Sequence, residues 1–182
     1  MKRSKTAVLL LMSAAPLLLT ACDDNAAREG MYTSVEACVA QTHDSATCKQ
    51  AFDKAQKDAL TTAPRFASQQ ECEVSYSAQQ CVARADGTGH SFFSPLMTGF
   101  FLSQMLRNGS PMSGFQSGPV FRDRRGDWQK PVGGGATGGS GYVAGAFRSG
   151  NTEMTRVNGS VDHAETVSRS GFGRFGGRGS GS

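Results

Sequence analysis

Glycine is distributed so unevenly along this chain of 182 residues that it limits where a core can form. Nineteen of the 23 glycines lie after residue 107, about one residue in four of the remaining chain. Such a segment loses much backbone entropy on folding and offers few side chains to pack. The composition therefore predicts a disordered Gly/Ser/Arg-rich tail over residues 108–182. The remaining unit, residues 31–107, is small enough to need disulfides, a metal or a partner, and too small for a large cofactor-binding enzyme.

The net charge argues against nucleic acid as a partner. The formal charge is +4, but three of the 19 basic residues lie within the first five positions. Without the first 21 residues, 16 basic residues stand against 15 acidic ones, and the net charge is +1. Binding to a phosphate backbone relies on a large basic excess. We therefore expect no nucleic-acid partner, although residues 169–178 imitate the Arg-Gly-aromatic segments of RNA-binding proteins.

The first 22 residues resemble the export signal of a bacterial lipoprotein. A cationic start precedes an apolar stretch over residues 7–19, which is shorter than the roughly 20 residues of a membrane-spanning helix. The stretch ends in Leu-Thr-Ala-Cys, which is typical of a lipobox. We therefore predict a signal peptide over residues 1–21 and a diacylglycerol and acyl anchor on Cys22, which would begin a tether over residues 22–30. The bilayer is then the first partner.

Asp23 and Asp24 follow the anchor position directly. Acidic residues at this place resemble the signal that retains lipoproteins at the inner membrane. The sequence therefore predicts a lipid-anchored protein at the periplasmic face of the inner membrane rather than at the outer membrane.

Four further cysteines remain, which in an exported chain predicts two disulfides with three possible pairings. A short repeat favours one of them, because an aromatic residue, a serine two positions later and a cysteine six positions later occur twice. The repeat predicts the pairs Cys38–Cys48 and Cys72–Cys81. No Cys-x-x-Cys motif is present, and the spacing around His43 fits no common zinc site. We expect structural disulfides, no metal, no cofactor and no catalytic residues.

Local signals in residues 31–90 favour helices. Two capping-box patterns, Thr33-x-x-Glu36 and Ser68-x-x-Glu71, predict short helices that begin just before Cys38 and Cys72. A longer helix is expected between them, capped by Asp44 or Ser45 and ending before Pro64. The predicted fold class is a small α-rich, disulfide-stapled head over residues 31–90.

Residues 91–107 form the most hydrophobic part of the chain outside the signal. Their apolar residues follow a spacing close to that of one broad helix face, which predicts a short amphipathic helix. Three roles stay open: packing onto the head, docking to a membrane or partner, or spanning the bilayer, for which the segment is short. The candidate docking residues are Phe92, Phe93, Leu96, Met97, Phe100 and Phe101.

Together, these parts resemble the YgiB-like family of bacterial envelope lipoproteins. The lipobox, the four cysteines, the Thr-Ala-Pro step at residues 62–64 and the Pro-Leu-Met-Thr-Gly segment at residues 95–99 carry the resemblance. The resemblance implies an envelope protein with no established activity. Genes of the family often neighbour an ATP-grasp enzyme similar to glutathionylspermidine synthase, which implies a possible accessory role to such an enzyme.

The sequence therefore predicts a membrane-anchored, non-enzymatic envelope protein that acts through structure or interaction, with an envelope protein as a possible partner. Two alternatives remain beside it. One is a thiol–disulfide redox protein or sensor that uses one of the cysteine pairs, and the other is the accessory partner of an ATP-grasp enzyme.

Overall fold

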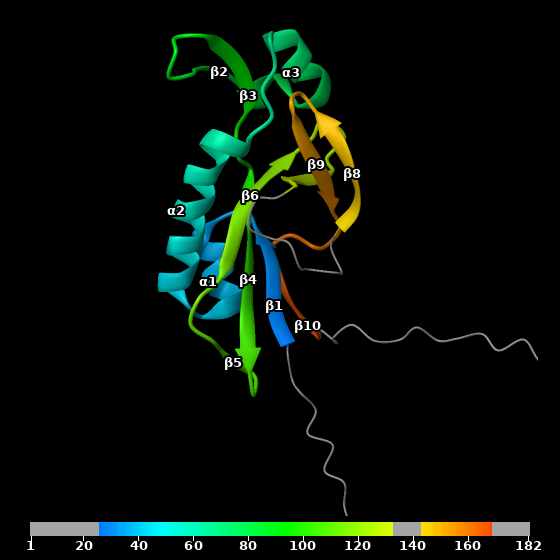
Figure 1. The fold of residues 1–182 in the computed structure, drawn as a ribbon. Coiled ribbons are helices and arrows are strands. Elements are labelled where there is room, and N and C mark those ends of the chain that lie inside the picture. The colour runs from blue at the N-terminus through cyan, green and yellow to red at the C-terminus, as the bar shows by residue number, and fades with distance from the viewer. Residues whose placement is uncertain (1–25, 133–142, 169–182) are drawn as a thin grey trace, which may run out of the picture.

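The computed structural model describes residues 26–132 and 143–168. One strand comes first in this part of the chain, three helices and a 3-10 turn follow, and nine strands complete it (Figure 1). The elements are β1 (Ala26–Tyr32), α1 (Val35–Thr42), α2 (Ser45–Thr62), α3 (Gln69–Ser75), the 3-10 turn η1 (Ala78–Gln80), β2 (Cys81–Ala85), β3 (Ser91–Pro95), β4 (Gly99–Arg107), β5 (Ser110–Pro111), β6 (Gln116–Arg122), β7 (Trp128–Pro131), β8 (Val143–Ser149), β9 (Thr152–Val157) and β10 (His163–Ser168).

Most of these strands form one antiparallel sheet with the order β10-β1-β4-β6-β7-β9-β8, and the short β5 pairs with β4. A separate hairpin joins β2 to β3. The first strand of the described chain lies between β4 and the last strand, with Ala26 opposite both Leu106 and Ser168. The two ends of the described chain therefore lie side by side at one end of the sheet (Figure 1).

Helices α1 and α2 cover one face of this sheet (Figure 1). Small side chains let α2 approach closely, because Ala51 and Ala55 are fully buried against the strands. The ring of Phe100 lies 5.6 Å from the rings of both Tyr32 and Phe52, centroid to centroid. The disulfide Cys38–Cys48 joins α1 to α2 within the same cluster.

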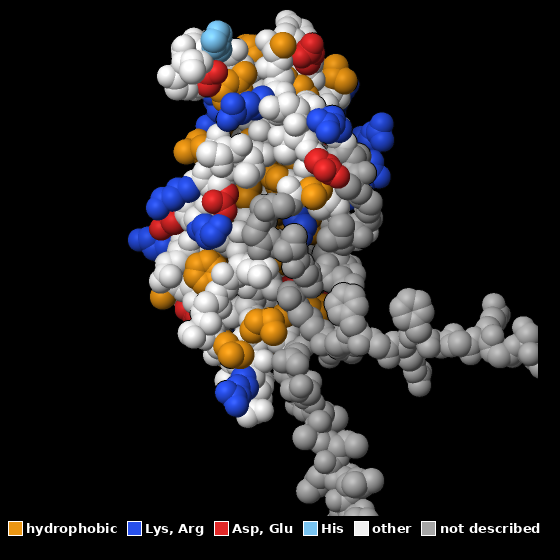
Figure 2. All heavy atoms as spheres, in the orientation of Figure 1, with side chains coloured by type: hydrophobic (Ala, Val, Ile, Leu, Met, Phe, Trp, Pro, Cys, Tyr) orange, Lys and Arg blue, Asp and Glu red, His pale blue; other side chains and the backbone are white. Residues whose placement is uncertain are grey.

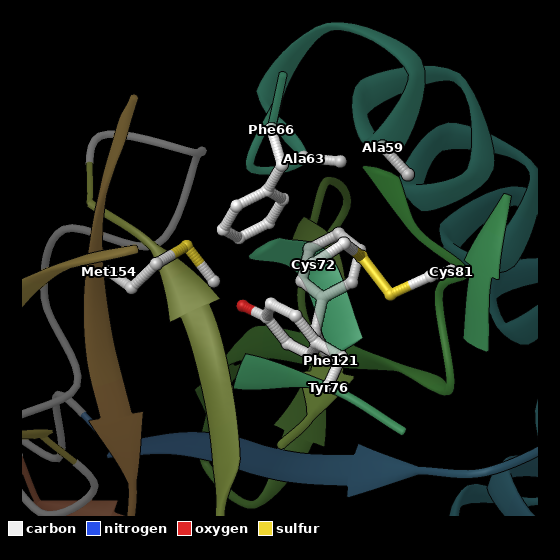
Figure 3. Packing of buried hydrophobic residues seen from close by; sticks show 8 residues of the cluster. All are labelled: Ala59, Ala63, Phe66, Cys72, Tyr76, Cys81, Phe121 and Met154. Carbon is white, nitrogen blue, oxygen red and sulfur yellow. A yellow bond between two sulfur atoms is a disulfide. The ribbon is translucent and has the colours of Figure 1, made fainter. Parts of the chain in front are cut away.

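A second cluster lies where α3 and the β2–β3 hairpin meet the sheet (Figure 3). Phe66 packs edge-on against Tyr76, with ring centroids 6.1 Å apart, and Phe121 and Met154 complete the cluster. The disulfide Cys72–Cys81 ties α3 to β2 at its border.

The opposite face of the sheet carries a third cluster, and we call it the concave face. It joins Met31 of β1, Phe101 of β4, Val120 of β6 and Val157 of β9. Because β1 and β9 are four positions apart in the strand order, a flat sheet would separate them by about 19 Å. The sheet must therefore curl to bring Met31 and Val157 into one cluster.

The α-rich fold class predicted from the sequence is wrong, because the structure is built mainly on an antiparallel sheet. The predicted helix over residues 91–107 is replaced by β3 and β4. Both faces of β4 are buried, with Phe100 and Leu102 toward the helices and Phe101 toward the concave face. A strand buried on both faces shows no alternation, so its apolar run imitates helical spacing.

The predicted disorder after residue 108 is also wrong for the described residues, which include β5 to β10. Many glycines of this region occupy turns rather than a coil: Gly109, Gly114, Gly126 and Gly150 all have positive φ. Glycine adopts this backbone conformation without steric cost, so it is favoured between strands. Residues 133–142 and 169–182 lie outside the described part.

The helix starts agree in part with the capping patterns. Asp44 caps α2 by accepting a hydrogen bond from the Thr47 amide, and Ser68 caps α3 by accepting one from the Glu71 amide. The cap of α1 is Ser34 rather than Thr33. Thr33 instead donates hydrogen bonds from its amide and its hydroxyl to Asp162, which lies just before the neighbouring strand β10.

Replacing Gly150 with alanine is expected to lower the free energy of unfolding by about 2 kcal/mol. Gly150 has φ of 55°, and an added Cβ would lie 2.5 Å from the backbone oxygen of Arg65. The same turn is fixed to this loop by the Arg65 amide, which donates to Asn151. Urea unfolding measures the change. Gly109→Ala is the matched control, because its φ is 76° but its Cβ meets open space. Equal losses in both variants would contradict the contact.

Candidate anion-binding groove

A groove of about 550 Å³ lies between the end of α3, the β6–β7 turn and the strands β8 and β9. Four arginines line it, against one acidic residue, Asp123. Figure 2 shows basic side chains gathered in this region, beside α3 and β8. The arginines are Arg124, Arg125, Arg148 and Arg156.

The β6–β7 turn holds two of these arginines in a fixed backbone frame. Asp123 accepts hydrogen bonds from the amides of Arg125 and Asp127, at 2.8 and 2.9 Å. Gly126 has φ of 93° and its amide donates to the Asp123 carbonyl, which closes the turn. The Arg124 amide donates to the carbonyl of Ser75, so the turn is also attached to α3. Both arginine side chains remain exposed.

A buried network of polar groups forms the floor. The Tyr76 hydroxyl donates to Gln129 at 3.1 Å, and the Gln129 amide nitrogen donates to Asp123 at 2.8 Å. Tyr76 also lies 3.3 Å from the Ser149 hydroxyl. Because the single hydrogen of Tyr76 goes to Gln129, Ser149 donates in this contact. Burial raises the pKa of Tyr76 to about 12, although the Ser149 hydrogen bond lowers it.

The charges in the groove favour an anion. The lining holds four guanidinium groups and one acidic residue, Asp123. Asp127 lies 3.7 Å from Arg156, measured from Oδ2 to Nε. Arginine donates in pairs to carboxylate and phosphate oxygens, so the groove can hold an oxyanion through charge-assisted hydrogen bonds. Within residues 26–132 and 143–168, no group of three His, Cys, Asp or Glu side chains is arranged to hold a metal.

Comparison with known proteins places the chain in a family. A family profile described as "Protein of unknown function (DUF1190)" matches residues 26–181. The chain belongs to the DUF1190 family. It is also 29% identical, over 187 residues, to a UPF0441 protein of Erwinia tasmaniensis, which covers 94% of this chain and 81% of that relative. No solved structure matches it.

The DUF1190 chain contains the two disulfides expected from its repeat. The pairs are Cys38–Cys48 and Cys72–Cys81, with Cα–Cα distances of 5.9 and 6.0 Å. All four cysteines are buried, and the two pairs lie in different clusters. Each disulfide closes a loop of about ten residues, which corresponds to about 2–3 kcal/mol of stabilisation.

The six residues predicted to dock are separated in this DUF1190 structure. Phe92 and Phe93 lie on β3, and the Arg65 guanidinium stacks 4.6 Å above the Phe92 ring. Leu96 and Met97 follow in the link to β4, where Leu96 is 40% exposed. Phe100 and Phe101 are buried on opposite faces of β4. The six therefore form no common surface.

The anchor predictions fall on the N-terminal residues of the DUF1190 chain. Residues 1–21, Cys22, Asp23 and Asp24 lie outside the described part, so lipidation and sorting remain predictions. Among the helices of the described residues, none combines the length and apolar character needed to cross a bilayer.

The sequence pattern does not identify the groove arginines. Only Arg124 and Arg125 are neighbours in the sequence, within the turn Asp-Arg-Arg-Gly-Asp at residues 123–127. Arg148 and Arg156 join them because β9 pairs with both β7 and β8. The acidic residues next to these arginines in the sequence suggest that the charges are neutralised locally. In the structure, however, Asp123 accepts hydrogen bonds from backbone amides of its own turn and not from the guanidinium groups beside it in the sequence.

Proposed function

We propose that this protein is a lipid-anchored envelope protein that acts by binding rather than by catalysis. One observation carries the proposal: the lipobox pattern ends at Cys22, only four positions before β1 begins at Ala26. A lipid on Cys22 would hold the folded head within about 14 Å of the bilayer, the reach of four extended residues. The resemblance to the YgiB-like lipoproteins supports the same assignment.

The cysteine pairs favour a structural role over a redox role. A working dithiol needs an accessible sulfur with a stabilised thiolate, whereas Cys38, Cys48 and Cys72 are fully buried. The arginine groove supports an interaction function, because its side chains are exposed and strongly charged.

The groove would also be well placed for a partner outside the membrane. Ala26 lies opposite Leu106, at one end of β4, while the β6–β7 turn begins after Arg122, beyond the other end. The end of the sheet at Ala26 and the β6–β7 turn are therefore separated by about nine residues of extended chain, or roughly 30 Å. A head that stands on its short tether would therefore direct the arginines into the periplasm.

The mass of the protein extracted from membranes tests the anchor. The expected product lacks residues 1–21 and carries an added diacylglycerol and acyl mass on Cys22. Cys22→Ser is expected to remain uncleaved and without lipid. The paired variant Asp23→Asn/Asp24→Asn is the matched control, since it should keep the lipid but move from the inner to the outer membrane fraction. A wild-type chain without lipid would refute the proposal.

A further inference from the structure

We propose that the arginine groove is a binding site for a phosphate group carried by a larger ligand. This inference goes beyond the anchor and does not depend on lipidation of Cys22. It rests on the charge of the groove, the number of arginine donors that line it, and the volume of the groove.

The lining of the groove carries an excess of positive charge. Four arginines and one aspartate give the lining a net charge of +3 at neutral pH. Within the described residues, no hydrogen bond or ion pair engages the guanidinium groups of Arg124, Arg125 and Arg148. Asp127 lies beside Arg156, but the lining as a whole keeps an excess of positive charge, which favours a ligand with more than one negative charge. A phosphate monoester carries about 1.5 to 2 negative charges at pH 7.

The groove offers more arginine donors than one carboxylate can use. One arginine can satisfy a carboxylate by a bidentate pair, so a single carboxylate cannot use four. The groove arginines come from three separate segments of the chain, the β6–β7 turn, β8 and β9. A phosphate group presents three oxygens in different directions and can accept hydrogen bonds from more than one arginine at once.

The floor and the size of the groove also suit a phosphate-bearing ligand. Gln129 gives one amide hydrogen to Asp123, which leaves its second amide hydrogen for a ligand oxygen. The Tyr76–Gln129–Asp123 chain fixes that amide, and Gln129 is 4% exposed. A volume of about 550 Å³ falls within the range of small-ligand sites, so the ligand extends beyond its phosphate group.

Titration of the full mature protein in neutral detergent tests the site. The probes are inorganic phosphate and, at equal ionic strength, acetate. We expect saturable phosphate binding at least about tenfold tighter than acetate binding, which corresponds to one additional charged contact. Equal affinities for both anions would overturn the proposal.

The groove variant is Arg125→Ser/Arg148→Ser, which removes two guanidinium groups. Its phosphate affinity is expected to fall about 100-fold. Arg107→Ser, at the exposed end of β4, removes a charge outside the groove and is expected to change the affinity less than about twofold. If Arg107→Ser weakens binding as much as Arg148→Ser alone, binding is non-specific and the site is refuted.

A second variant keeps the test valid if the double variant does not fold. Arg148→Lys keeps the positive charge but loses the bidentate fork, so it should weaken phosphate binding about tenfold. Thermal unfolding confirms the folded state of each variant. An Arg148→Lys protein with wild-type phosphate affinity would overturn the assigned geometry.

Reconstituted vesicles distinguish the source of the phosphate. The lipidated protein is placed in neutral phosphatidylcholine vesicles, or in vesicles that also contain phosphatidylglycerol, and titrated with inorganic phosphate. Equal affinity in both supports a ligand from the aqueous phase, as the distance between the groove and Ala26 favours. A tenfold loss in the anionic vesicles supports a lipid headgroup instead. Loss of lipidation alone would leave the detergent titration unchanged, so the two proposals fail independently.

Discussion

Replacing Glu29 with alanine is expected to lower the free energy of unfolding by about 3–5 kcal/mol. Glu29 is fully buried on the concave face, where the Ser103 hydroxyl donates to its carboxylate at 3.1 Å. Lys130 is also buried there, with Nζ 4.6 Å from the centre of the Phe101 ring. Burial lowers the pKa of Lys130, and the charge of Glu29 opposes that shift. Each charge therefore depends on the other, and truncation of Glu29 would leave the ammonium buried without its carboxylate.

Urea unfolding of four variants separates the charge effect from packing. Glu29→Gln and Lys130→Met each remove one charge, and the double variant removes both. The double variant is expected to lose less stability than the sum of the single losses, by at least about 1 kcal/mol. Glu153→Ala, an exposed carboxylate on β9, is the control and should lie within about 0.5 kcal/mol of wild type. Additive losses would show that the two charges do not interact.

Raising the pH from 10 through about 12 is expected to remove roughly 5 kcal/mol of folding free energy. Burial raises the pKa of both Tyr32 and Tyr76 from 10.0 to about 12, although Arg28 opposes the shift at Tyr32 and Ser149 opposes it at Tyr76. A group whose folded pKa lies above its unfolded pKa contributes its full stability below the unfolded value. That contribution is lost as the pH rises through the folded value. Each tyrosine accounts for about half of this loss, because its pKa differs by about two units between the folded and unfolded states.

Tyrosinate absorbance at 295 nm, followed beside circular dichroism, measures this effect. Two tyrosines should stay protonated well above pH 10 and ionise together with loss of the folded state. Tyr32→Phe and Tyr76→Phe should each remove one delayed titration and about half of the alkaline destabilisation. Ionisation near pH 10 with the fold intact would contradict the burial of these hydroxyls.

The helical part of the fold could be predicted because its signals are local. The caps of α2 and α3 depend on residues three positions apart, and the two disulfides span 10 and 9 positions. The sheet depends on pairings across the whole chain, which leave no local pattern. Leu60 illustrates the limit, since it fits an apolar helix face but is 57% exposed. Alanines provide the contact of α2 instead, because the sheet lies too close for larger side chains.

The candidate site was harder to predict than the fold. Its arginines are separated in the sequence by residues 126–147, and only strand pairing brings Arg148 and Arg156 toward the β6–β7 turn. Gln129 and Ser149 carry no motif, and their role depends on Tyr76, which comes from α3. A site that is assembled from single residues on several hairpins has no characteristic spacing in the sequence by which it could be recognised.

The position of β1 determines when the sheet can be completed during folding. Residues 26–30 of β1 pair with residues 164–168 of β10. The first strand of the head therefore gains its second neighbour only when the last described strand is present. Loop closure over such a span makes this a late and slow event. A nascent or truncated chain that ends before residue 163 would present the outer edge of β1 as an open template for other strands or proteases. Completion of the sheet therefore depends on the pairing of β1 with β10, the first and last strands of the described chain.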